Sequence, residues 1–183
     1  MKTIWLTGIS AAGKTTIANL YRDKYNESVI IIDGDSIRKT INAHLGFTQA
    51  DRDKNIETAA RICKLLNDDG HLVIATISSP LEKQREMAKK IVGENNFFLV
   101  YVACSIEAAI GRDPKGLYQK YYKGEIKNMA GLDMPYEAPS DASLTLNTEY
   151  FDILTSVKTL KIAITKNNYL NDEHSNSLQH KIQ

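Results

Sequence analysis

The chain has 183 residues, of which 43% are hydrophobic and 25% are charged, the proportions of an ordinary water-soluble globular domain. Its formal net charge is +1, so bulk charge favours binding neither to nucleic acid nor to a membrane surface. No stretch reaches the length of an apolar membrane span and the first predicted strand leaves no room for a signal peptide, so we expect a cytoplasmic protein.

The first 25 residues predict a strand, a glycine-containing loop and a helix. Residues 3–7 are apolar and β-prone, whereas residues 14–25 carry apolar side chains at helical spacing. Between them, residues 8–15 read GISAAGKT, which has the G-x-x-x-x-G-K-T spacing of a phosphate-binding loop, or P-loop. A P-loop directs successive backbone N–H groups at an anion, and its lysine lies beside the β- and γ-phosphates. The P-loop alone therefore predicts a nucleoside triphosphate with Mg²⁺, and the resemblance described below identifies the triphosphate as ATP.

The P-loop motif also assigns roles to individual residues. Lys14 is the expected catalytic cation, and the Thr15 hydroxyl is the expected metal ligand. The alternative, a glycine turn before an ordinary helix, is disfavoured by the strand and helix that flank the motif. The expected ATP-binding residues are Gly8, Ser10, Ala11, Ala12, Gly13, Lys14, Thr15, Thr16 and, from a later segment, Arg112.

The rest of the chain alternates between predicted strands and helices. Strands are expected at residues 28–32, 71–76, 97–103 and 143–146. Helices are expected at residues 36–45, 49–69, 80–92, 106–111 and 149–165, although 160–165 is also compatible with a strand. Thr48 is a candidate N-cap and Gly70 a candidate C′ glycine for the longest helix. This alternation predicts an α/β fold, a three-layer αβα sandwich with a five-stranded parallel sheet as in P-loop kinases.

Two segments differ from this pattern. Residues 113–139 are rich in Lys, Tyr, Gly and Pro and show little apolar periodicity, which is typical of a lid over a binding site. From residue 166 to 183 the chain is polar and Asn-rich, and we expect a disordered tail. The remainder, residues 1–165, is predicted to be a single kinase domain that includes the lid.

Seven short motifs, taken in order, resemble the adenylylsulfate kinases. They are DGDSIR (33–38), LGFT (45–48), DRDKNI (51–56), SP (79–80), RDPKGLY (112–118), GEIK (124–127) and PYE (135–137). The resemblance extends from residue 3 to about residue 160. It implies transfer of the γ-phosphoryl group of MgATP to the ribose 3′-hydroxyl of adenosine 5′-phosphosulfate, and it implies a small-molecule nucleotide acceptor and, often, a homodimer.

The resemblance also implies a set of acceptor-binding residues. Asp35 follows a predicted strand and is the candidate that orients or deprotonates the acceptor hydroxyl, with helix N-capping as its alternative role. Single arginines are usually solvated, a serine before proline often serves a turn, and exposed lysines often only contact water. The implied acceptor-binding residues are Asp35, Arg38, Phe47, Arg52, Asn55, Ser78, Ser79, Lys120, Met129, Ala130, Gly131 and Leu132.

The departures from the family pattern fall mainly on the acceptor side. Met129 stands where the family has a phenylalanine that flanks the acceptor base, Ala130 replaces a threonine, and Ser78 replaces an isoleucine. A thioether is a more flexible and weaker platform for a base than a ring. These departures leave a second hypothesis, in which the acceptor is cytidine diphosphoramidate for capsule biosynthesis. A third hypothesis, a nucleotide-binding regulator with weak catalysis, is disfavoured by intact Lys14, Thr15 and Asp35.

Overall fold

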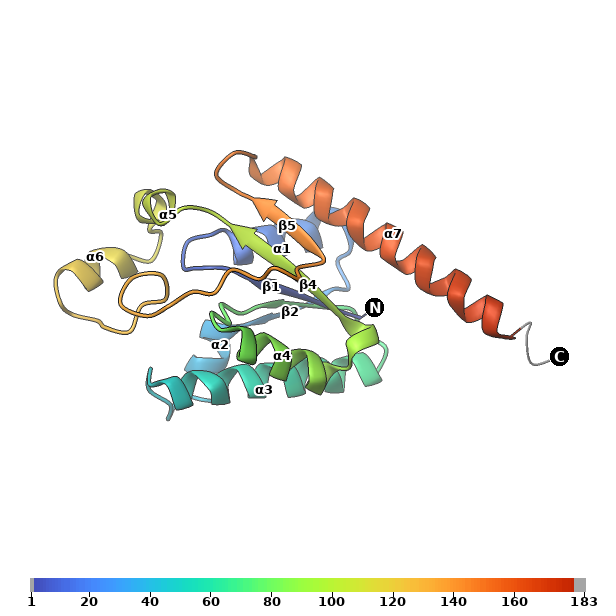
Figure 1. Cartoon of the computed structure of the whole chain (residues 1–183), viewed down its shortest axis with the longest axis horizontal. Helices are drawn as coiled ribbons and strands as arrows, with labels where there is room; N and C mark the ends of the chain where they lie inside the picture. The colour runs from blue at the N-terminus through green and yellow to red at the C-terminus, as the bar shows by residue number, and fades with distance from the viewer. Residues whose placement is uncertain (1, 180–183) are drawn as a thin grey trace.

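The computed structural model describes residues 2–179, and it contains one sheet of five parallel strands in the order β2-β3-β1-β4-β5 (Figure 1). The strands are β1 (Thr3–Thr7), β2 (Ile30–Asp33), β3 (Val73–Thr76), β4 (Phe97–Ala103) and β5 (Leu144–Asn147). β1 lies at the centre, with β3 on one side and β4 on the other. The strand order therefore reverses beside β1, and the carboxyl ends of strands at such a point form a crevice that binds ligands.

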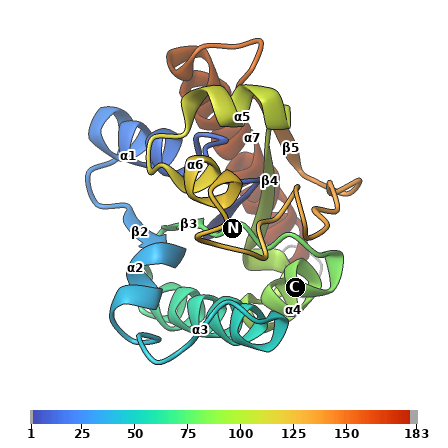
Figure 2. The same ribbon diagram turned by 90° about the vertical axis from the view of Figure 1, so that its left-hand side faces the viewer.

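Helices cover both faces of the sheet, which confirms the expected α/β sandwich (Figure 1). On one face lie α1 (Lys14–Tyr25) and α7 (Ile153–Gln179), and on the other lie α2 (Gly34–Lys39), α3 (Gln49–Asp68) and α4 (Glu82–Val92). Two shorter helices, α5 (Ile106–Arg112) and α6 (Leu117–Tyr122), gather at one end of the molecule (Figure 2), and a 3₁₀ turn, η1 (Glu94–Asn96), precedes β4. In the described chain, no helix has the length and apolar character to cross a membrane.

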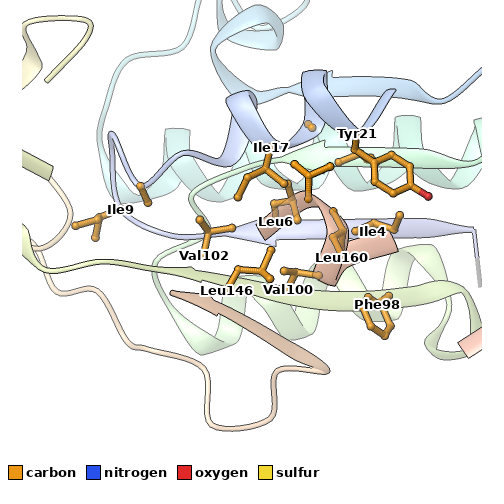
Figure 3. Packing of buried hydrophobic residues seen from close by; sticks show 14 of the residues in the cluster. Ile4, Leu6, Ile9, Ile17, Tyr21, Phe98, Val100, Val102, Leu146 and Leu160 are labelled. Atoms are coloured by element: carbon orange, nitrogen blue, oxygen red, sulfur yellow. The ribbon is translucent and has the colours of Figure 1, made fainter. Parts of the chain in front are cut away.

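Alternating side chains of the central strand divide the core between the two faces. Ile4 and Leu6 belong to the cluster beneath α1 and α7, whereas Trp5 belongs to the cluster beneath α3 and α4. In Figure 3, Ile17 and Tyr21 of α1 lie over the β1 side chains. Because the central strand is buried on both faces, its sequence is a continuous apolar run instead of an alternating one.

The long helix and its caps are as the sequence predicts. The Thr48 hydroxyl accepts a hydrogen bond from the Asp51 N–H at 3.2 Å, and the Asp51 carboxylate accepts one in return from the Thr48 N–H at 3.1 Å. Gly70 ends the segment with φ of 90°, in the left-handed region that favours glycine. This reciprocal capping fixes the start of α3, which is next to several predicted acceptor-binding residues.

Several predicted element boundaries are wrong. The helix expected at 36–45 ends at Lys39, because the Thr40 hydroxyl donates to Ser36 O and the buried Asn42 turns back through its N–H to Ile37 O. Pro80 does not lie in the first turn of a helix, since α4 starts at Glu82. Strands β2, β3 and β5 start one or two residues later than expected.

The C-terminal helix and the lid also differ from expectation. α7 begins at Ile153, not near residue 149, and it continues to Gln179 instead of ending at 165. The strand alternative for 160–165 is excluded because these residues are helical, and Leu160 and Ile164 belong to the core cluster. The end of the predicted tail, residues 180–183, lies outside the described residues. Within the predicted lid, the chain forms α6, which its weak apolar periodicity did not indicate.

Truncation of Leu160 should show how much α7 contributes to stability. This side chain is 0% exposed in the cluster shared with α1, so Leu160→Ala should lower the free energy of unfolding by about 2–5 kcal/mol in urea titrations. The control is Ile162→Ala on the same helix, where the side chain is 48% exposed and the expected loss is below about 1 kcal/mol. Equal losses in the two variants would contradict the packing of α7 against α1.

Candidate active site

A cleft of about 960 Å³ lies at the carboxyl edge of the sheet. It is lined by the P-loop, the start of α2, the loop after β3, the lid and the start of α7. The predicted residues that line it are Ser10, Ala11, Ala12, Gly13, Lys14, Thr15, Thr16, Asp35, Arg38, Phe47, Arg52, Asn55, Ser78, Ser79, Arg112, Met129 and Ala130. The two predicted groups, for ATP and for the acceptor, thus share one continuous cleft.

Two glycines shape the P-loop for separate reasons. A Cβ at Gly8 would lie 2.5 Å from the backbone oxygen of Val102, so the close approach to β4 requires glycine. Gly13 caps α1 with φ of 102°, in the left-handed region. The first intrahelical bond of α1 runs from Ile17 N to Gly13 O at 2.9 Å. The N–H groups of residues 14–16 therefore have no intrahelical acceptor and are available to an anion in the cleft.

Lys14 is a buried cation at the base of this loop. Its Nζ donates to Gly8 O and to Ile9 O, both at 2.8 Å. Burial lowers the pKa of Lys14 to about 8, although the nearby Asp35 carboxylate opposes the shift. The ammonium is held by backbone oxygens of its own loop and lies in the cleft wall, where it can pair with phosphate oxygens.

The Asp33 carboxylate connects the P-loop to the neighbouring elements. Its Oδ2 accepts hydrogen bonds from the Thr15 hydroxyl at 3.1 Å and from the Thr76 hydroxyl at 2.8 Å. Its Oδ1 accepts from the N–H groups of Asp35 and Ser36, so Asp33 is the N-cap of α2. Burial alone would raise the pKa of Asp33, but these hydrogen bonds outweigh it and the pKa is lowered. The N-cap role considered for Asp35 therefore belongs to Asp33.

The oxygens around Thr15 have the chemistry of a magnesium site. The Thr15 hydroxyl and the ionised Asp33 carboxylate lie 3.1 Å apart beside the P-loop. Mg²⁺ prefers oxygen ligands and usually takes only one or two from the protein, with phosphate oxygens and waters as the others. Among the described residues there is no group of three or more His, Cys, Asp or Glu that could hold a metal. The residues present fit a metal that arrives with phosphates.

Asp35 is exposed to the cleft and pairs with the lid. Its Oδ2 lies 2.5 Å from Nζ of Lys115, and each side chain is 55% exposed. The hydrogen bond to Asp35 raises the pKa of Lys115, and burial opposes that shift. Since the backbone of α2 is capped by Asp33, the Asp35 carboxylate is free to bind other groups in the cleft.

An aromatic ring with two guanidinium groups beside it lines another part of the cleft. The Phe47 ring is 60% exposed, and its centroid lies 5.0 Å from Cζ of Arg38 and 5.8 Å from Cζ of Arg52. Arg38 also donates to Gly46 O at 2.7 Å, and Arg52 to Phe47 O at 3.2 Å. A second nitrogen of Arg52 donates to Asn128 O, which joins the Phe47 loop to the segment containing Met129.

Asn55 and Ser79 are buried, and their polar atoms are already bonded within the protein. Asn55 Oδ1 accepts from Asn42 at 3.0 Å, and its Nδ2 donates to Gly34 O at 3.3 Å. The Ser79 hydroxyl accepts from the Trp5 indole N–H at 3.0 Å and donates to Thr7 at 3.1 Å. Ser79 therefore contributes backbone to the cleft, while its hydroxyl is turned into the core.

Four predicted site residues do not line the cleft: Gly8, Lys120, Gly131 and Leu132. Gly8 is the first residue of the P-loop, and its carbonyl accepts a hydrogen bond from Lys14. Lys120 is exposed on α6, and Leu132 packs against the core cluster. A Cβ on Gly131 would lie 2.7 Å from the Ile106 side chain, so this glycine serves packing. The cleft residues around Met129 come from 125–130, not from 129–132.

The loop after β5 is a part of the site that sequence reasoning missed. Thr148, Phe151, Asp152 and Ile153 line the cleft. Arg112 donates to the Thr148 hydroxyl at 3.0 Å and to the Thr148 carbonyl at 2.5 Å, which fixes this loop beside the P-loop. The missed signal was positional, because these residues directly follow a parallel strand and such strand ends meet at the ligand-binding edge.

A P-loop after the central strand, a carboxylate after β2 and a lid together define a P-loop kinase that phosphorylates a small molecule. The comparisons with known proteins agree. The family model for adenylylsulphate kinase matches residues 1–147, and the chain belongs to this family. It is therefore a phosphotransferase with a hydroxyl acceptor.

Individual relatives show the extent of the similarity. The adenylyl-sulfate kinase of Clostridium kluyveri is 43% identical over 148 residues, which are 79% of this chain and 74% of the relative. The bifunctional enzyme NodQ of Rhizobium sp. (strain N33) is 43% identical over 147 residues, but this match spans only 23% of NodQ. Among solved structures, Mycobacterium tuberculosis APS kinase CysC in complex with AMPPNP and APS has a TM-score of 0.85 at 36% identity, covering 90% of this chain and 97% of that one.

The lowered pKa of Lys14 predicts a pH-dependent stability. The folded protein releases this proton near pH 8, whereas an unfolded lysine holds it until about pH 10.5. Between pH 8 and pH 10.5 the unfolded chain binds more protons than the folded chain, so the free energy of unfolding rises with pH over this range. Below pH 8 both states hold the proton, and Lys14 adds no pH dependence. Relative to Lys14→Met, the wild-type stability should rise by about 1–3 kcal/mol from pH 8 to pH 10. Urea titrations at these pH values measure the difference, and parallel pH curves would show that Lys14 has an ordinary pKa.

Proposed function

We propose that the chain transfers the γ-phosphoryl group of ATP to the ribose 3′-hydroxyl of adenosine 5′-phosphosulfate. The observation that carries this proposal is the Phe47 ring with Arg38 and Arg52 beside it, in the same cleft as the P-loop and Asp35. An aromatic face suits a nucleobase, and guanidinium forks suit phosphate and sulfate oxygens. The relatives named as adenylyl-sulfate kinases and the neighbour solved with AMPPNP and APS support this choice.

The donor half of the reaction uses the P-loop. The free N–H groups at the start of α1 and the buried Lys14 ammonium would bind the β- and γ-phosphates and neutralise charge as it moves to the leaving oxygen. Arg112, held against Thr148, lies at the end of the cleft beside Ala11, where the adenosine of ATP would lie. Thr15 and Asp33 would hold Mg²⁺, which when bound supplies charge neutralisation between the phosphates.

The acceptor half uses Asp35. A ribose hydroxyl is a weak acid, so a nearby carboxylate that accepts its hydrogen bond both orients the oxygen and takes up the proton as the bond to phosphorus forms. Asp35 extends from the first turn of α2 into the cleft and is not used for capping. Phe47, Arg38 and Arg52 would hold the rest of the acceptor, so that the hydroxyl is presented in line with the γ-phosphate.

The second candidate acceptor, cytidine diphosphoramidate, is favoured by one observation. Met129 lines the cleft at 7% exposure, so the second platform beside Phe47 is a thioether and not a ring. A smaller pyrimidine loses less from that replacement than a purine does.

Replacement of Asp35 should separate catalysis from binding. With MgATP and adenosine 5′-phosphosulfate, Asp35→Asn should lower kcat by about 100-fold or more, while the KM for ATP changes by less than about threefold. The assay measures initial rates of ADP formation. Asp23→Asn, an exposed carboxylate on α1, is the control and should keep wild-type rates. A wild-type enzyme that turns over only cytidine diphosphoramidate would replace the proposed acceptor with the second candidate.

The acceptor platform can be tested at Met129. Met129→Phe should lower the KM for adenosine 5′-phosphosulfate by about 5- to 20-fold, because stacking of a base on an aromatic ring contributes roughly 1–3 kcal/mol. Met129→Leu, which has a similar volume but no ring, is the matched control and should leave this KM within about twofold. If both variants bind the acceptor equally, Met129 does not contact the base.

A further inference from the structure

The buried Arg85 on α4 has no role in the site as described so far. The residue is 3% exposed, and its guanidinium is paired with no carboxylate among residues 2–167. Its Nε has no hydrogen-bond partner in the described chain. Arginine stays charged at all ordinary pH values, and a buried charge without a counter-ion is costly. Such a group needs an explanation other than packing, because an apolar side chain would fill the space at lower cost.

The hydrogen bonds of the Arg85 guanidinium both go to the loop between β3 and α4. Its Nη1 donates to Ser79 O at 3.1 Å and to Pro80 O at 3.2 Å. The preceding carbonyl, Ser78 O, accepts from the Thr7 hydroxyl at 2.5 Å. Three successive carbonyl oxygens of this loop are therefore bonded to groups of the protein interior.

The side of the loop that lines the cleft therefore presents few hydrogen-bond acceptors. Neither Ser78 N–H nor Ser79 N–H donates to an acceptor within the described part of the chain. Ser79 also has φ of 33°, in the left-handed region, which is strained for a residue other than glycine. Backbone strain of this kind persists only where surrounding contacts enforce it, and the two Arg85 bonds are among those contacts.

We propose that Arg85 is a positioning residue for the acceptor. By holding the carbonyl oxygens of Ser79 and Pro80 inside the protein, it removes their partial negative charges from the cleft wall, so that the anionic tail of the acceptor meets N–H groups instead. The unpaired guanidinium behind the loop adds a positive potential of the same sign. This inference rests on the proposed function, because it requires an acceptor with an anionic tail.

Arg85 also shares a contact with the lid. Pro80 O accepts a second hydrogen bond from Glu137 N at 2.8 Å, and the Glu137 carboxylate accepts from Glu82 N at 2.6 Å. Tyr136 contacts the Thr7 hydroxyl at 3.0 Å. The C-terminal end of the lid is thus fixed to the loop that Arg85 holds. A change at Arg85 should therefore disturb the acceptor-binding part of the cleft more than the P-loop.

The test compares Arg85→Met and Arg85→Lys with Lys90→Met, which removes an exposed charge from the same helix. Steady-state rates with adenosine 5′-phosphosulfate should show about a tenfold or larger rise in the acceptor KM for Arg85→Met, while the KM for ATP stays within about twofold. Arg85→Lys keeps the charge but has a shorter reach. Its acceptor KM should lie between those of wild type and Arg85→Met, at least about threefold above wild type. Lys90→Met should match wild type in both constants.

A second measurement does not depend on turnover. Trp5 is the only tryptophan in the chain, and its indole N–H is bonded to Ser79 Oγ at 3.0 Å. Its fluorescence therefore reports on the loop that Arg85 holds. Titration of the ADP-bound protein with adenosine 5′-phosphosulfate should give a dissociation constant that rises in Arg85→Met by the same factor as the acceptor KM. Thermal melts establish whether each variant is folded. If Arg85→Met does not fold, the comparison is made with Arg85→Lys.

The outcomes separate the two proposals. A wild-type protein that neither turns over nor binds adenosine 5′-phosphosulfate refutes the proposed function, and the Arg85 inference with it. An active wild type together with a folded Arg85 variant whose acceptor KM is within about twofold refutes the Arg85 inference alone. Equal rises in the KM for ATP and for the acceptor would assign Arg85 a merely structural role, and would also overturn the inference.

Discussion

The Asp33 carboxylate joins three segments whose relative positions define the cleft. One of its oxygens binds the hydroxyls of Thr15 in the P-loop and Thr76 at the end of β3, and the other binds the first N–H groups of α2. Because its four hydrogen bonds come from three different segments, the carboxylate can neither rotate nor move without breaking several of them. Asp35, two residues further on, therefore has a fixed distance from the P-loop. The donor and acceptor halves of the reaction depend on this link.

The two halves are built in different ways. The donor half follows from backbone geometry at the end of the central strand, where Gly8 and Gly13 allow conformations that other residues resist. The proposed acceptor half is assembled from long side chains, chiefly Arg38, which reaches Gly46 before α3, and Arg52, which reaches Asn128 in the lid. A half made from side chains can change its ligand without a change of fold. The departures expected at Met129, Ala130 and Ser78 fall in this half.

The sequence predicted the sheet and most of the cleft because both depend on local signals. The buried strands are continuous apolar runs, the P-loop has a fixed spacing, and the Thr48 cap is visible from its residue type. The end of α2 was missed because it is decided by a contact between residues far apart in the chain. Asn42, for example, leaves the helical path to bond Asn55 across 13 positions.

The misplaced site residues have a similar physical origin. Ser79 was expected among the acceptor-binding residues, with a turn as the alternative role of its hydroxyl. That hydroxyl belongs instead to a network with Trp5 and Thr7, which are 74 and 72 positions away in the chain. Arginine is a residue type typical of the exposed face of a helix, so the sequence does not indicate that Arg85 is buried. Only the fold places it behind the loop at the end of β3. Local patterns identify which chemistry a site contains, but they do not show which atoms of a residue face it.

The ion pair between Asp35 and Lys115 has a consequence for how the site fills. Lys115 of the lid bonds one oxygen of the Asp35 carboxylate, Oδ2, and the carboxylate has a second oxygen that can accept another hydrogen bond. Under the proposed function, Asp35 would therefore bind the acceptor hydroxyl and the lid lysine at the same time. One carboxylate would link the acceptor to the lid and would place the lysine close to the incoming negative charge.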